Sequence, residues 1–163
     1  MFPWSQLLLD SIIVILAFSV FVVGTLVWKP RLWIQDFPAD LQAMLGPKTA
    51  EEKRLTALIA LPFFALFFGL PLLLGWDLKT TMGSDFSFVM AWLYGYGMFF
   101  IVNLWDLVVI DWIGTSLVDP QNPPFPGTEG AAGYRDYAFH FRGFLKGCAM
   151  GIVFATVFAL VLA

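Results

Sequence analysis

The chain has 163 residues, of which 60% are hydrophobic and 13% are charged, with a formal net charge of −3. This composition lies far from that of a soluble globular domain and excludes that class. The length suits one domain, and no basic cluster stands free of acidic neighbours, so nothing indicates nucleic-acid binding.

Four continuous apolar stretches are each long enough to cross a bilayer as a helix, which takes about 20 residues. None alternates polar and apolar residues as a membrane barrel strand does. The predicted spans are residues 7–27, 55–76, 86–112 and 144–163. The sequence therefore predicts an all-α integral membrane protein, a single domain built as an antiparallel four-helix bundle.

The first connecting loop contains an amphipathic segment, residues 31–45. Its apolar side chains recur at helical spacing, so we expect an interfacial helix that lies along the membrane surface. Further on, Thr49 and Glu52 have the spacing of a capping box, which predicts the start of the second long helix.

The second predicted span contains Pro62 and Pro71. Each removes a backbone hydrogen bond, so we expect this helix to be kinked. A broken helix that lines a substrate path is the alternative, and the frequency of proline in membrane helices favours the kink.

The third loop, residues 119–127, is rich in proline and is expected to be an extended strap. The fourth helix is expected to begin near Tyr134. Small residues recur along it at every fourth position, which favours close approach of another helix. These predicted packing residues are Gly143, Gly147, Gly151, Ala155 and Ala159.

Basic residues concentrate in the first and third loops, and the second loop has only Lys79. The positive-inside rule therefore predicts that loops one and three are cytoplasmic and that both termini lie outside. The predicted location is the cell (inner) membrane, with several crossings and with membrane lipid as a partner.

Polar residues gather at the end of the third span and the start of the fourth. An amide or carboxylate at membrane depth is costly unless it faces protein, water or a ligand. By the predicted topology both segments lie at the cytoplasmic end, where Asp136 could orient His140 from four residues away. The candidate polar cluster comprises Asn103, Asp106, Asp111, Asp136, His140 and Arg142.

Two interpretations of this cluster remain open. Asp106, Asp111 and His140 could hold a divalent metal or act as acid and base, and His140 could be an axial ligand of a pigment. Alternatively, Asp106 pairs with Arg142 or Arg135 and pins the third loop. No specific motif supports a metal or a pigment, so the cofactor stays unknown and ion pairing is favoured. Asp10, near the opposite end, is expected to snorkel or to cap its helix.

Several polar segments carry a resemblance. Residues 30–42 (PRLWIQDFPADLQ), 47–54 (PKTAEEKR) and 126–129 (PGTE), with the Tyr-Arg-Asp-Tyr segment that leads to His140 and Gly147, resemble a group of bacterial integral membrane proteins. No activity is assigned to that group. The resemblance implies a four-helix membrane fold and nothing catalytic.

Taken together, these features predict a non-enzymatic accessory or partner-binding subunit. It would bind a protein partner, or a second copy of itself, through the small-residue face of the fourth helix. The alternative is a small membrane-embedded enzyme, or a protein that binds metal, lipid or pigment at the Asp/His cluster.

Overall fold

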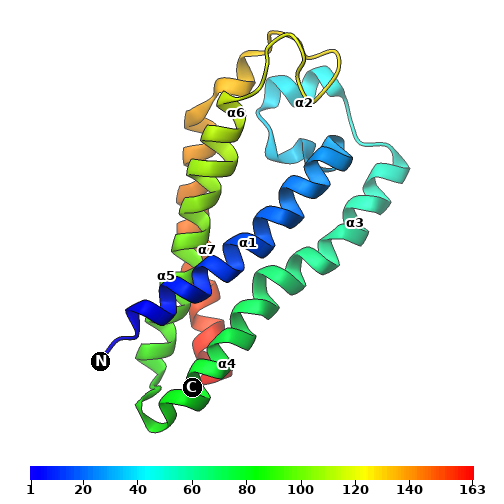
Figure 1. Cartoon of the computed structure of the whole chain (residues 1–163). Coiled ribbons are helices and arrows are strands. Elements are labelled where there is room, and N and C mark those ends of the chain that lie inside the picture. Colours follow the sequence, from blue (N-terminus) through cyan, green and yellow to red (C-terminus); the bar gives the residue numbers. More distant parts are fainter.

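Figure 1 shows the computed structural model of the chain, which describes residues 1–163 and contains helices and loops without a strand. Four helical segments are long and apolar enough to cross a membrane. The predicted all-helical class is confirmed, as is the number of helices long enough to span. The four segments are Trp4–Trp28, Ala50–Asp85, Phe88–Ser116 and Tyr137–Leu162.

Two of the four segments are interrupted by π-helical turns, in which the backbone hydrogen bond joins residues five apart. The first segment is α1 (Trp4–Trp28), and the second runs through α3 (Ala50–Phe64), the π-helical η2 (Ala65–Gly69), α4 (Leu70–Met82) and the 3-10 turn η3 (Gly83–Asp85). The third runs through α5 (Phe88–Trp105), the π-helical η4 (Asp106–Ile113) and α6 (Gly114–Ser116), and the fourth is α7 (Tyr137–Leu162).

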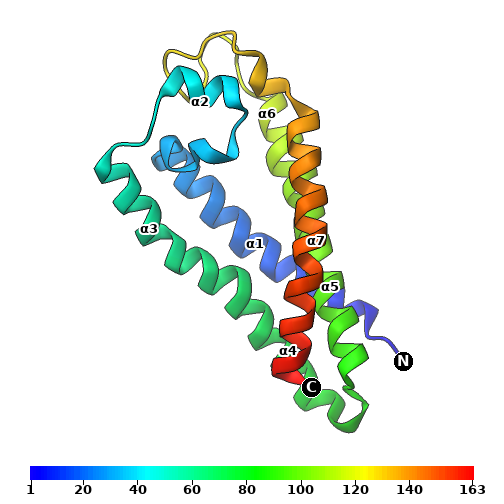
Figure 2. The same cartoon turned by 180° about the vertical axis from the view of Figure 1, so that it is seen from behind.

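The long segments diverge toward one end of the molecule. Figures 1 and 2 show α5 and α7 side by side, while α3 leans away from them and α1 crosses between the two arms. The arms meet near α4 and the C-terminus. The opposite end carries α2 (Ala39–Leu45) and both long loops, and we call it the loop end. The arrangement is therefore V-shaped rather than an evenly packed bundle.

The close pairing of α5 and α7 follows from the small residues of α7. Ala155 and Ala159 are fully buried. A Cβ atom at Gly151 would lie 2.8 Å from the ring of Phe99, and one at Gly147 would meet the side chain of Asn103. Gly147 and Gly151 of the predicted packing face thus lie against α5 of the same chain, and Ala155 and Ala159 are buried inside it.

The prolines of the second segment flank a π-helical turn. Pro62 lies near the end of α3, and Pro71 lies in the first turn of α4, directly after η2. A proline ring clashes with the carbonyl of the preceding turn and donates no hydrogen bond. The wider η2 turn makes room for the proline ring and tolerates the missing hydrogen bond, so the helix stays continuous.

Asp10 of α1 is buried, which corrects the expectation that it snorkels or caps. It is 1% exposed, and both carboxylate oxygens accept hydrogen bonds, from the Tyr94 hydroxyl at 2.5 Å and from Gln6 Nε2 at 2.8 Å. Tyr94 is fully buried in α5. The carboxylate therefore joins α1 to α5 inside the apolar core.

The segment predicted as one interfacial helix forms two short helices, η1 (Pro30–Asp36) and α2 (Ala39–Leu45), because Pro38 separates them. Leu41 of α2 is fully buried with Phe125 and Tyr134 of the third loop. The two loops thus share a small core of their own, and the third loop is not a simple extended strap.

Hydrogen bonds join the first and third loops to each other and join the first loop to α3. The Asp40 carboxylate accepts from the Gly133 N–H at 2.8 Å, which joins α2 to the 3-10 turn η5 (Ala132–Arg135). Arg31 donates to Glu52 at 2.6 Å. Glu52 and Thr49 also form the predicted capping box at the start of α3, with both hydrogen bonds present. The loop end is therefore a folded cap over the open side of the V.

Candidate functional site

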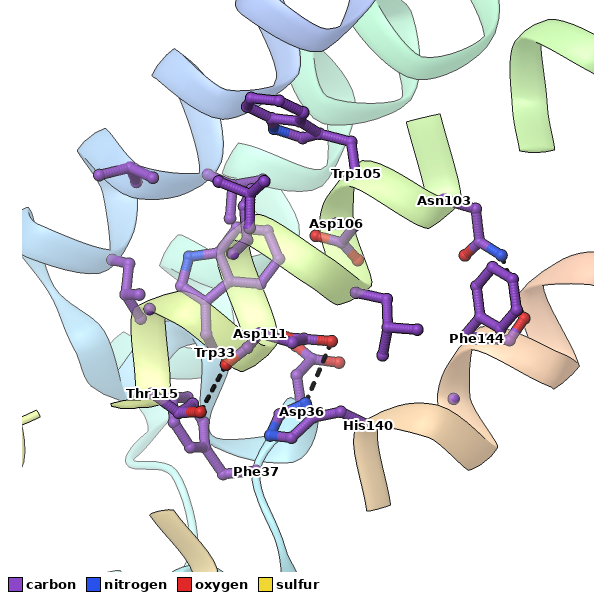
Figure 3. A pocket seen from close by; sticks show the side chains of 18 of the residues that line it. Trp33, Asp36, Phe37, Asn103, Trp105, Asp106, Asp111, Thr115, His140 and Phe144 are labelled. Atoms are coloured by element: carbon purple, nitrogen blue, oxygen red, sulfur yellow. Dashed lines mark hydrogen bonds and ion pairs between the residues drawn. The ribbon is translucent and has the colours of Figure 1, made fainter. Parts of the chain in front are cut away.

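A cavity of about 770 Å³ lies at the loop end, between α1, η1, η4 and the first turns of α7. Of its 27 lining residues, 14 are hydrophobic. The polar residues of η4 and α7 contribute to the same space (Figure 3). We call this space the loop-end cavity.

Hydrogen bonds hold two tryptophans in the walls of the cavity. Trp33 of η1 donates from Nε1 to Thr25 of α1 at 3.0 Å, and Trp105 of α5 donates to Ser19 of α1 at 3.0 Å. Each bond satisfies an indole N–H that would otherwise have no partner within the chain. The apolar surfaces of both rings remain available to the cavity.

The π-helical geometry of η4 brings Asp106 and Asp111 to the same cavity. In a regular α-helix, residues five apart point about 140° away from one another. In a π-helical turn the hydrogen bond joins residues five apart, so their side chains lie closer to one face. Both aspartates line the loop-end cavity. Their convergence depends on this turn.

Asp111 and His140 form the central contact of the site. His140 Nδ1 lies 3.1 Å from Asp111 Oδ2, and Figure 3 shows the ring extending from α7 toward Asp111 and Asp36. The histidine is 6% exposed, and its Nε2 has no hydrogen-bond partner.

Two further carboxylates face this pair. Asp106 takes part in none of the ion pairs of the structure. Asp36, at the end of η1, accepts a hydrogen bond from Gln35 at 2.8 Å. Loss of water raises the pKa of the Asp36 carboxyl, an effect that Lys48 opposes and the negative charge of Asp111 reinforces. The loop-end cavity is thus acidic on this side.

The other members of the predicted cluster have different surroundings. Asn103 donates to the Phe144 carbonyl at 3.0 Å and so joins α5 to α7. Asp136 caps α7 by accepting from the Phe139 N–H at 2.9 Å, and does not contact His140. Arg142 lies 3.9 Å from Asp136. The predicted pairing of Asp106 with Arg142 or Arg135 is not formed.

The arrangement limits the chemistry of the site. No three His, Cys, Asp or Glu side chains are grouped as ligands for a metal ion, so Asp106, Asp111 and His140 share a cavity without forming such a group. An imidazole that is oriented by a carboxylate and has one free ring nitrogen can accept a proton or a hydrogen bond at that nitrogen. The site is thus equipped to hold a polar group, and an acid–base role is the enzymatic alternative.

Sequence reasoning missed several residues of this cavity. Asp36, Trp33 and Phe37 come from the first loop, and nothing in the sequence shows that this loop folds over α7. Thr115 also lines the cavity and donates to the Asp111 carbonyl four residues earlier at 2.5 Å. The only signal was the amphipathic pattern of the loop, which fits a membrane surface equally well.

Compared with protein-family models, with curated proteins and with solved structures, the chain shows no match. Functional inference therefore starts from the geometry of the loop-end cavity.

Proposed function

We propose that this chain is a multi-pass membrane protein that binds an amphipathic small molecule in the loop-end cavity. The observation that carries the proposal is one space of about 770 Å³ that combines apolar walls with a buried, unpaired polar atom, His140 Nε2. Sites for small molecules usually have volumes of about 300–1,000 Å³, with a few polar groups among apolar walls.

The distribution of polar groups favours an amphipathic ligand over a wholly apolar one. The carboxylates and His140 belong to η1, η4 and the first turns of α7, whereas α1 contributes mainly apolar side chains such as Phe18 and Val22. A hydrocarbon chain would contact the apolar walls, and a polar head group would satisfy the unpaired atoms. Such a molecule would enter from the surrounding lipid.

A cavity-filling substitution tests the proposal. A Cβ atom at Gly143, which lines the cavity, would have no atom within 4 Å, so Gly143→Trp adds a large side chain without a backbone clash. We expect native mass spectrometry to find a bound amphiphile on the wild-type protein and at least about tenfold less on the variant, because the space is occupied.

Gly24→Trp is the matched control. Gly24 also lies in a helix with no atom within 4 Å of a Cβ, but it does not line the cavity. This variant should retain the ligand. Equal occupancy in Gly143→Trp and wild type, or a wild-type protein that neither carries nor takes up any amphiphile, would contradict the proposal.

The proposal includes an orientation in the cell (inner) membrane, with the loop end in the cytoplasm and both termini outside. Its support is the basic content of the loops, because Lys29, Arg31 and Lys48 all lie at the loop end. Lipids of the cytoplasmic leaflet would then have the shortest route to the cavity.

A role as a partner-binding subunit is the second candidate, and one observation favours it. The membrane segment Ala50–Asp85 is only 6% buried over its most apolar window, against 28–39% for the other three. Exposed side chains such as Leu61 and Leu73 belong to it. A partner would use this segment, because the small-residue face of α7 lies against α5. Native mass spectrometry would record such a complex directly.

A further inference from the structure

One buried polar atom of the loop-end cavity has no hydrogen-bond partner. His140 Nδ1 lies 3.1 Å from Asp111 Oδ2, and in the neutral tautomer that carries its hydrogen on Nδ1 the other ring nitrogen, Nε2, is an acceptor. The ring is 6% exposed and Nε2 has no partner within the chain. A buried acceptor without a donor is costly, so this atom points to a group that the chain itself does not supply.

The neighbouring carboxylates add more acceptors of the same kind. Asp106 lines the cavity without an ion-pair partner, and Asp36 accepts a single hydrogen bond, from the amide of Gln35. An ionised carboxylate can accept several hydrogen bonds and donates none. One side of the cavity therefore presents several carboxyl groups with free lone pairs.

The donors that line the same space are already used or stand at its edge. The indole N–H groups of Trp33 and Trp105 bond to α1, and the amide of Asn103 bonds to α7. The only cationic side chains on the wall are Arg142 and Lys146, and both are exposed on α7. Lys48 acts on Asp36 through its charge, but its hydrogen bonds go to Leu32, Gln35 and Thr56.

We propose that the head group of the ligand is a protonated primary amine, held by His140 Nε2 and the carboxylates of Asp106, Asp111 and Asp36. This inference rests on the proposed function and specifies the class of ligand. An ammonium group supplies three N–H donors to these acceptors, and its positive charge favours the ionised form of the carboxyls beside it. An anionic head group would meet repulsion from the same carboxylates.

A series of probes with one ten-carbon chain and different head groups tests the inference. The probes are decylamine, decyltrimethylammonium, decanol and decanoate, titrated by calorimetry into the full-length protein in a neutral maltoside detergent. We expect decylamine to bind at least about tenfold more tightly than decyltrimethylammonium, which has the charge but no N–H donor. Decanol should be weaker than the amine, and decanoate weakest.

Two variants link this preference to the site. Asp106→Asn removes a carboxyl that has no ion-pair partner and would pair with the ammonium, so decylamine should bind about tenfold more weakly while decanol changes little. Asp85→Asn is the matched control, because it removes an exposed carboxylate beyond the far end of α4. It should leave all four affinities unchanged.

The outcomes separate the two proposals. Binding that is equal for all head groups, or tightest for decanoate, overturns the assignment of an amine head group. If that binding is lost in Gly143→Trp, the cavity is still supported as the binding site. Binding that Gly143→Trp leaves unchanged would overturn the proposed function itself. The Gly143→Trp protein also corrects for probe that merely enters the detergent micelle.

The amine can belong to a long-chain amine or to a phospholipid with an ethanolamine head group. One further probe in the same titration distinguishes them. Lyso-phosphatidylethanolamine carries the same ammonium next to a phosphate, which Arg142 and Lys146 could meet at the edge of the cavity. Tighter binding than decylamine identifies the phospholipid, and weaker binding identifies the simple amine. Either result supports the ammonium head group.

Discussion

Among the histidine and the acidic and basic side chains, His140 and Asp10 are the two that the protein buries most completely, at 6% and 1% exposure. Both oxygens of Asp10 accept hydrogen bonds, whereas His140 uses one ring nitrogen and leaves the other unpaired. A fully satisfied buried group stabilises the fold, and a half-satisfied one requires a further partner. This difference indicates that Asp10 stabilises the packing of the helices, whereas His140 is available to contact the proposed ligand.

The contact between Asp10 and Tyr94 leads to a prediction about stability. Tyr94→Phe removes the donor and leaves Asp10 Oδ2 buried without a partner, which should lower the free energy of unfolding by about 1–3 kcal/mol. Adding Asp10→Leu removes the stranded acceptor, so the double variant should recover much of the loss. Unfolding in mixed maltoside and dodecyl sulfate micelles measures both, and a double variant weaker than Tyr94→Phe would contradict this account.

Individual partners were the least predictable part of the site. Spacing along the helix favoured Asp136 as the residue that orients His140, but Asp136 instead caps the first turn of α7. The partner is Asp111, which comes from another segment of the chain. A sequence shows which polar groups need partners at membrane depth, but long-range packing decides which partner each group finds.

At the scale of elements, the π-helical turn η4 does most to shape the site. It brings Asp106 and Asp111 to one cavity, although regular helical spacing would direct them apart. The sequence predicts a helix here but contains no proline or glycine pattern that marks the wider turn. The start of α3 shows the opposite case, because the Thr49 capping box is a local signal and was predicted correctly.

The packing of α5 against α7 predicts opposite effects for one substitution at two positions. Gly147→Leu inserts a side chain against Asn103, so we expect overpacking to destabilise the fold by about 1–3 kcal/mol. Gly143→Leu, one turn earlier, extends into open space and should be neutral or stabilising by up to about 1 kcal/mol. Thermal unfolding in detergent measures both, and equal shifts would show that the α7 face is not packed against α5.

For the whole molecule, the divergence of the helices creates the loop-end cavity. Composition predicts four membrane helices because about 20 apolar residues are needed for each crossing, and four such segments are present. The angles between the helices depend on side-chain packing, which apolar runs do not specify. The open end of the V and the loops that cap it could therefore not be predicted from the sequence, nor could the cavity between them.

The central claim is that an amphipathic molecule occupies the loop-end cavity, and photo-crosslinking tests it most directly. A decylamine analogue with a diazirine in its chain would be irradiated with the protein in lipid nanodiscs, and labelled peptides mapped by mass spectrometry. We predict labelling concentrated on cavity residues such as Val22, Ile110 and Phe139, and lost in Gly143→Trp. Labelling spread over exposed side chains such as Leu61 and Leu73, and unchanged in the variant, would contradict the claim.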